Sequence, residues 1–274
     1  MLKLFPSRRA RAEARARRNM AAGTVLLTIY LYPGQRWFYR KYLARHIDPL
    51  LTDERVRRLA PELYQNLAAY TLLFVVPQLL NVAVNRQWPS AVRSGFGRWW
   101  IGLPLTAIGM PLVYAIARAG AKDAAIQEEY PLPPSAAADA GDFVLWEISE
   151  GLYYTAWESF FRGFLEAPME EAYGKDAAVW FQTALSTVAH LGKPAAETFG
   201  AIPGGIAFSW LARTTRSWIY PMLLHWELGI LTDYFAARES GRNPFGVTAG
   251  ERQPPPPKPE KAVKQKTARS RKKK

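Results

Sequence analysis

The chain has 274 residues, a net charge of +13 and no cysteine. The missing cysteines exclude disulfide frameworks, thiol catalysis and cysteine-ligated metal centres. With three histidines in the whole chain, a metal site built from several imidazoles would use nearly all of them.

The positive charge is concentrated in two tails. Residues 1–18 carry a net charge of +6 and residues 251–274 a net charge of +8, which leaves about −1 on residues 19–250. A basic face on the folded part, of the kind that binds nucleic acid, is therefore not expected, and the C-terminal Lys/Arg run lacks aromatic residues to stack on bases. We expect the tails to contact anionic lipid headgroups instead.

Apolar segments recur along the body of the chain, in the order 20–32, 67–84, 99–119, 143–165, 177–191, 199–212 and 218–237. Several approach the roughly 20 residues needed to cross about 30 Å of hydrocarbon. Aromatic clusters such as Trp99 and Trp100 flank them, as is typical of the headgroup region. The pattern favours an all-α, multi-pass transmembrane helical bundle of about six to eight membrane helices, some short or broken. A soluble all-α protein with long core helices is the alternative.

Three regions follow from composition: a basic arm at 1–18, a membrane-embedded domain at 19–240 and a Pro/Lys-rich tail at 241–274. We expect the tail to be disordered, because Pro254–Pro257 cannot be helical and the charged run after them buries nothing. No small-residue cleavage site follows the Arg-rich start, so a retained first membrane helix is expected. The basic tails and loops favour a bacterial cytoplasmic membrane protein with both tails cytoplasmic and an even number of spans.

Ionisable residues enter an apolar helix within 143–165. A charge inside a membrane is costly, so it normally faces the bundle interior and has a partner. At 100° per residue, Glu147, Tyr154 and Glu158 lie on one stripe, and Arg162 follows Glu158 by one turn. This order favours an i,i+4 ion pair, which serves either a functional site or helix packing alone.

The next apolar segment ends in a histidine. His190 precedes a break at Gly192-Lys193-Pro194, where Lys193 and Glu197 can converge with it beside unpaired backbone groups. A helix end with a capping histidine and a snorkelling lysine explains the same pattern.

The last apolar segment holds a second histidine. His225 and Gly229 share a helix face, and Asp233 lies another turn on. A lone histidine on an apolar helix is usually a hydrogen-bonded core group. Two histidines on two helices beside a Glu/Arg helix favour a site.

Together these residues resemble the CPBP family, which comprises the type II CAAX prenyl endopeptidases and the bacterial Abi or bacteriocin-processing membrane proteins. Its motifs are written EExxxR, FxxxH and HxxxN, and Glu158 with Arg162, His190 and His225 follow that order within 143–237. The resemblance implies an α-helical intramembrane protease that hydrolyses a peptide bond of a membrane-associated protein or peptide.

In that family a glutamate and a histidine activate water. The resemblance therefore implies that Glu158 with His190 activates water, that Arg162 holds Glu158, and that His225 stabilises the oxyanion. Lys193, Glu197 and Asp233 are supporting candidates. No cofactor is expected, since a metal-free glutamate mechanism suits this ligand set better than a divalent metal.

Three positions depart from the motifs. Trp157 stands where the first Glu of EExxxR is expected, Ser186 replaces the Phe of FxxxH, and Gly229 replaces the Asn of HxxxN. In that family the His and the Asn of HxxxN stabilise the oxyanion, so Gly229 removes one donor, and loss of one oxyanion donor costs on the order of 10²–10³ in rate. Two hypotheses stay open: an active endopeptidase with Glu158 or Glu197 as the base, and a catalytically inactive CPBP-like membrane scaffold or adaptor. A transporter is less favoured, because no inverted repeat is apparent.

Overall fold

The computed structural model describes residues 7–137 and 139–246, and within these ranges the regular structure is entirely helical. The expected all-α class is therefore confirmed for this part of the chain. The expectation of a disordered tail falls almost wholly on residues outside the described ranges. In chain order the elements, with η for a 3-10 or π-helical segment, are α1 (Arg8–Leu31), α2 (Arg36–Phe38), η1 (Tyr39–Leu43), α3 (Ala44–Ile47), η2 (Asp48–Leu50), α4 (Glu54–Ala69), η3 (Tyr70–Val75), α5 (Val76–Ala83), η4 (Pro89–Val92), α6 (Trp99–Gly120), α7 (Ala124–Glu129), η5 (Pro134–Ala137), α8 (Ala140–Glu158), η6 (Ser159–Leu165), α9 (Glu166–Tyr173), α10 (Lys175–Ala189), α11 (Ala195–Thr215) and α12 (Ile219–Glu239).

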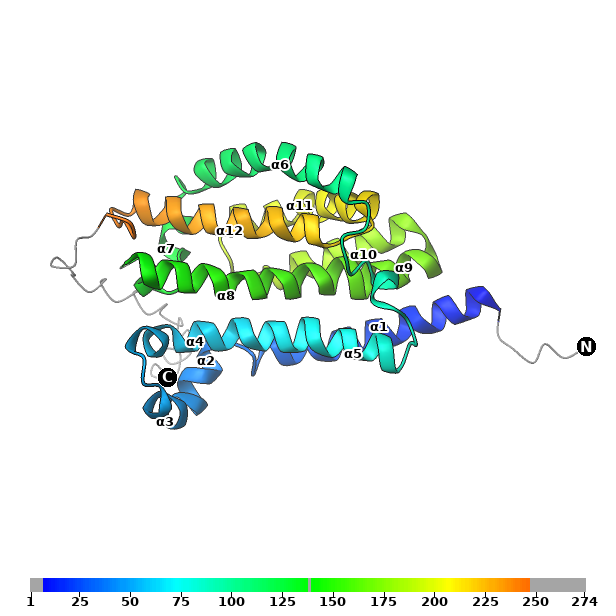
Figure 1. Ribbon diagram of the computed structural model, residues 1–274, viewed down its shortest axis with the longest axis horizontal. Helices are drawn as coiled ribbons and strands as arrows, with labels where there is room; N and C mark the ends of the chain where they lie inside the picture. The colour runs from blue at the N-terminus through cyan, green and yellow to red at the C-terminus, as the bar shows by residue number, and fades with distance from the viewer. Residues whose placement is uncertain (1–6, 138, 247–274) are drawn as a thin grey trace, which may run out of the picture.

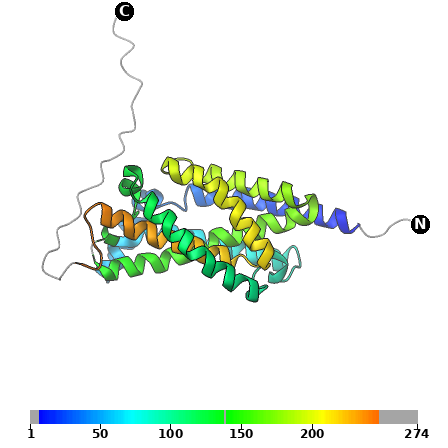
Figure 2. The same ribbon diagram turned by 90° about the horizontal axis from the view of Figure 1, so that it is seen from above.

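The long helices run along the long axis of the molecule as a bundle (Figure 1). α12 packs between α6 and α8, and α4 packs on the other side of α8. α10 packs against α9 and forms a hairpin with α11, which slants across the bundle towards α6 (Figure 2). The segments that carry the three motifs, α8–η6, α10 and α12, therefore meet inside one bundle.

Two of the longest helices contain a π-helical segment. η3 joins α4 to α5, and η6 joins α8 to α9 in one helix from Ala140 to Tyr173. A π-helical turn bonds residue i to i+5 and is frequently found at functional sites. η6 starts directly after Glu158 and contains Arg162.

Side-chain caps and charges fix the helix ends. The Asp139 carboxylate accepts a hydrogen bond of 2.9 Å from the Asp142 amide and so begins α8. Asp142 is itself fully buried and lies 2.7 Å from Arg55 and 3.0 Å from Arg58 on α4. These contacts fasten the start of α8 to α4.

α1 begins at Arg8, so most of the basic arm expected at 1–18 is the first part of a helix. Ala12 and Ala16 of this part are buried, and Arg15 forms an ion pair with Glu171 on α9. These contacts, which charge composition alone does not reveal, hold the basic segment against the bundle.

The largest apolar cluster surrounds η6. Trp157, Phe160, Phe161 and Phe164 pack against buried residues of α1 and η3, including Leu73. Because lipid tails are as apolar as these side chains, close van der Waals packing is what holds such helices together in a membrane. The motif helix is thus rigidly placed at the centre of the bundle.

The outer face of α6 is also apolar: Ile108 is 72 % exposed and Leu112 64 %. Within the described residues, Glu54–Ala83 and Trp99–Gly120 are long and apolar enough to cross a membrane. The expected six to eight spans stay a prediction. Figure 1 shows the first residues of α1 and the last residues of α12 at opposite ends of the bundle. The expectation that both tails face the cytoplasm concerns mainly residues outside the described ranges and stays a prediction as well.

Candidate active site

Glu158 is fully buried and joins two helices. Its Oε1 lies 2.7 Å from Nδ1 of His225 on α12, and its Oε2 lies 3.1 Å from Nε of Arg162. The ion pair expected from the i,i+4 spacing is therefore confirmed. The Arg162 contact has the distance of an ion pair without the direction of a hydrogen bond, since Oε2 and Nε both have no hydrogen-bond partner among the described residues. Oε2 thus keeps a lone pair free inside the bundle.

Aromatic rings enclose His225. The ring of Tyr154 lies 4.6 Å from the imidazole and that of Phe208 5.3 Å, measured between centroids. The Arg162 guanidinium also lies 5.7 Å from the Phe208 ring. Aromatic faces attract cations, so the Phe208 ring can stabilise the Arg162 guanidinium.

His190 lies at the end of α10 with its ring fixed from one side. Its Nδ1 lies 2.6 Å from the Ser186 carbonyl oxygen. A carbonyl only accepts, so Nδ1 carries the proton and Nε2 of a neutral ring is left as an acceptor. The ring of Trp157 meets His190 edge-on at 5.4 Å. Within the part of the chain that the structure describes, no hydrogen bond or ion pair joins His190 to Glu158.

Lys193 and Glu197, on either side of Pro194, lie close together, and the Tyr130 hydroxyl contacts both of them. Lys193 Nζ lies 2.9 Å from the Tyr130 hydroxyl, which donates to Glu197 Oε2 at 2.6 Å. Lys193 and Glu197 are themselves 3.9 Å apart. These three side chains close the loop that carries His190.

Asp233 lies away from the Glu158–His225 pair. Eight residues at about 1.5 Å each place it roughly 12 Å further along α12 than His225. There it accepts a hydrogen bond of 2.5 Å from Trp146 Nε1. Asp233 therefore takes part in a separate polar contact, with Trp146 of α8, nearer the C-terminal end of α12.

Residues 155–230 match the family model of the Rce1-like type II CAAX prenyl endopeptidases. Over this segment the chain is similar to the CPBP family. The match contains Glu158, Arg162, His190 and His225, so it confirms the resemblance drawn from the three motifs. It supports a CAAX protease-like, membrane-embedded endopeptidase at the level of the family. The comparisons with curated proteins and with solved structures give no match.

Further polar side chains, which the sequence analysis did not identify, hold the helix that carries Glu158 and Arg162. Arg93, from the loop before α6, donates to the Arg162 carbonyl at 2.9 Å and to Glu166 Oε1 at 2.9 Å. Glu166 is fully buried and accepts from Ser209 of α11 at 2.7 Å. The spacing Glu158, Arg162, Glu166 could have identified Glu166, whereas nothing in the sequence places Arg93.

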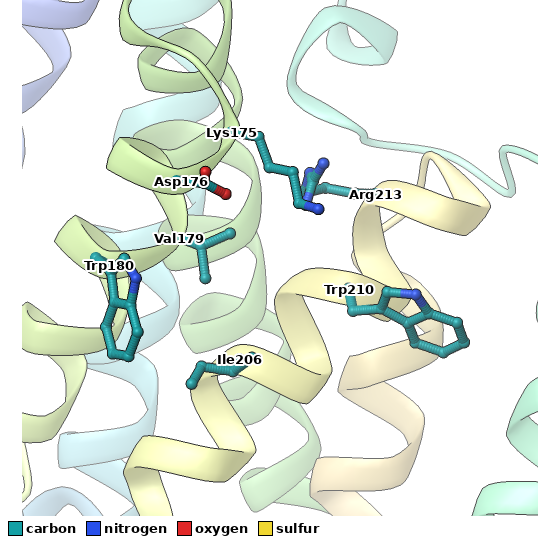
Figure 3. A pocket seen from close by; sticks show the side chains of 7 residues that line it. All are labelled: Lys175, Asp176, Val179, Trp180, Ile206, Trp210 and Arg213. Carbon is teal, nitrogen blue, oxygen red and sulfur yellow. The ribbon is translucent and has the colours of Figure 1, made fainter.

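A groove of about 220 Å³ lies between α10 and α11 (Figure 3). Trp180 and Trp210 lie on opposite sides of it in Figure 3, and Lys175 and Arg213 border its rim. None of its lining residues is a motif residue of the Rce1-like segment. This groove is therefore separate from the candidate site.

Within the described residues, no cluster of three or more His, Asp or Glu side chains is placed to hold a metal ion. The expectation that the protein uses no cofactor stays a prediction.

Proposed function

We propose that this protein is an intramembrane endopeptidase resembling the CAAX prenyl proteases, which hydrolyses a peptide bond of a membrane-associated protein or peptide. The family match supports a protease at the level of the family. The observation that carries the proposal for the site is the 2.7 Å contact between Glu158 Oε1 and His225 Nδ1.

In this proposal His225 acts as an imidazolium whose Nδ1–H donates to Glu158 Oε1. A distance of about 2.7–2.9 Å is typical of a charge-assisted N–H···O⁻ hydrogen bond, and the flanking rings of Tyr154 and Phe208 stabilise a cation. An imidazolium held through Nδ1 has its Nε2–H left to donate. In the proposed reaction, that N–H stabilises the oxyanion that forms when water adds to the peptide carbonyl.

His190 is the base in this proposal. The resemblance implied Glu158 as the base together with His190. Glu158, however, is fully buried between His225 and Arg162, and no described hydrogen bond or ion pair joins it to His190. The Nε2 of His190 is free to accept, because Nδ1 donates to Ser186. His190 takes a proton from water as the water oxygen bonds to the carbonyl carbon, and returns it to the leaving nitrogen as the C–N bond breaks.

The test uses the full chain in liposomes and a fluorogenic membrane-anchored peptide, in a prenylated CAAX form and an unprenylated form. His190→Ala and His225→Ala are expected to lower the cleavage rate by about 10² or more. His46→Ala is the matched control, because His46 is exposed and contacts the Arg45 side chain, outside the site. Full activity in either site variant would refute the assigned roles.

A catalytically inactive CPBP-like membrane scaffold is the second candidate. It is favoured by Trp157, whose indole contacts the His190 ring where the family motif has a glutamate, and an indole cannot take a proton from water. In this case the wild-type protein cleaves neither peptide, and Trp157→Glu is the variant expected to gain cleavage.

We also propose that the start of α1 lies at a membrane surface. Arg8, Arg9, Arg11 and Arg17 are exposed there, and exposed arginines next to a membrane attract anionic lipids at about 1 kcal/mol each. Nucleic acid is not proposed as a partner. The location in a bacterial cytoplasmic membrane belongs to the same proposal.

A further inference from the structure

Gly229 stands at the position of the Asn in HxxxN, one turn after His225. A Cβ atom added to Gly229 would lie 2.4 Å from the Tyr154 hydroxyl oxygen, and 2.7 and 2.8 Å from two carbons of its ring. These distances are far inside van der Waals contact. The phenol of Tyr154 therefore occupies the space into which a side chain at position 229 would extend.

The same phenol lies beside the proposed oxyanion donor. The Tyr154 ring contacts the His225 imidazole with centroids 4.6 Å apart and planes inclined by 48°. Tyr154 precedes Glu158 by one turn on α8, as Gly229 follows His225 by one turn on α12. The pair Glu158–His225 and the pair Tyr154–Gly229 are thus consecutive contacts between the same two helices.

The Tyr154 hydroxyl has its proton available. Within the described residues no hydrogen bond uses this hydroxyl, although the side chain is partly buried in the bundle. A phenol is a hydrogen-bond donor that stays protonated near neutral pH. A phenylalanine would fill the same volume, so the ring alone does not account for the hydroxyl.

We propose that Tyr154 is a catalytic residue whose phenol O–H stabilises the oxyanion together with His225, in place of the amide that Gly229 lacks. The inference rests on the proposed endopeptidase function. When the water oxygen bonds to the carbonyl carbon, the carbonyl oxygen takes up the electron pair of the C=O bond, and the phenol donates to it without transferring its proton. Collapse of this intermediate re-forms the C=O bond and expels the leaving nitrogen.

The first measurement is turnover of the membrane-anchored peptide by Tyr154→Phe. Loss of one oxyanion donor is expected to lower kcat by about 10²–10³ with KM little changed. Tyr153→Phe is the matched control, because Tyr153 precedes it on the helix and its ring packs against Trp157 at 5.6 Å rather than against His225. A kcat of Tyr154→Phe equal to that of wild type overturns the inference.

A second set of variants tests whether an amide at position 229 can replace the hydroxyl of Tyr154. Gly229→Asn alone is expected to lose activity, because the new side chain collides with Tyr154. Tyr154→Ala removes the collision and the hydroxyl, and Tyr154→Ala/Gly229→Asn then supplies an amide in the vacated space. The double variant is expected to exceed Tyr154→Ala in kcat by about tenfold or more. Equal rates contradict a shared donor role.

The affinity for an inhibitor tests the role of Tyr154 independently of whether the protein cleaves a peptide. A peptide phosphinate carries an anionic oxygen where the oxyanion forms, and its affinity is measured without turnover. Tyr154→Phe is expected to weaken phosphinate binding at least about tenfold and to leave binding of the uncleaved peptide unchanged. If wild type cleaves nothing but the phosphinate effect holds, the endopeptidase proposal fails and the donor role of Tyr154 stands. Equal phosphinate affinities overturn the inference whether or not the protein turns over.

Discussion

Glu158→Gln is the sharpest test of how this bundle holds its buried charges. The substitution keeps the shape of the side chain and removes its negative charge. Arg162 is 2 % exposed and would be left beside a neutral amide, as would His225. No described acidic side chain other than Glu158 forms an ion pair with Arg162.

The expected cost follows from the burial of both partners. Removing one member of a buried ion pair typically costs about 3–5 kcal/mol, because the other charge stays buried and uncompensated. For a chain of this size about 1 kcal/mol shifts the melting temperature by roughly 2–4 °C, so Glu158→Gln is expected to lower it by about 6–20 °C. Glu158→Gln/Arg162→Met removes both charges and is expected to be clearly more stable than the single variant.

Thermal unfolding of the purified proteins in detergent, followed by tryptophan fluorescence, measures these differences. Glu54→Gln is the control, because Glu54 is 77 % exposed and its pair with Arg57 spans 3.4 Å; its melting temperature is expected to stay within about 2 °C of wild type. The reasoning is wrong if Glu158→Gln melts like that control, or if the double variant is no more stable than the single one.

Two further predictions concern packing and a helix anchor. Gly102→Ala places a Cβ 2.2 Å from the buried Tyr220 ring, so a loss of about 1–3 kcal/mol is expected in the same melting assay. Gly120→Ala in the same helix meets no atom within 4 Å, and its melting temperature should not fall. Asp142→Asn deprives two half-exposed arginines of α4 of their buried partner, and a loss of about 1–2 kcal/mol is expected after allowance for solvent screening. A melting temperature of Asp142→Asn that equals wild type contradicts the role of these contacts as the anchor of α8.

The sequence predicts those parts of the site that depend on local geometry. The Glu158–Arg162 pair follows from i,i+4 spacing on one helix, and the break after His190 follows from Gly192 and Pro194. The choice of histidine that meets Glu158 depends on how α12 packs against α8, which the spacing of residues does not determine. The neighbour of Trp157 is likewise set by helix packing. Trp157 is next to Glu158 in sequence, but its ring contacts His190 at the end of α10.

Contacts from distant loops could not be predicted. Arg93 reaches the motif helix from a loop in which its own backbone has φ of +59°, and it binds Glu166 and Glu170 at once. Nothing in a polar loop indicates such a contact. Similarly, composition separates Arg8–Arg18 from the apolar residues after them, whereas the backbone continues through both as one helix.

The π-helical segment η6 lets the long helix hold an additional residue without changing the direction in which the following residues point, because each of its turns bonds residue i to i+5 instead of i+4. Loss of one residue between Ser159 and Leu165 would let this turn tighten to α-helix, and Glu166 would still face Arg93 and Ser209. Loss of one residue in the regular helix of α8 would instead turn all that follows by about 100°. A one-residue gap between related chains is therefore tolerated at η6 and not in the α-helical turns before it.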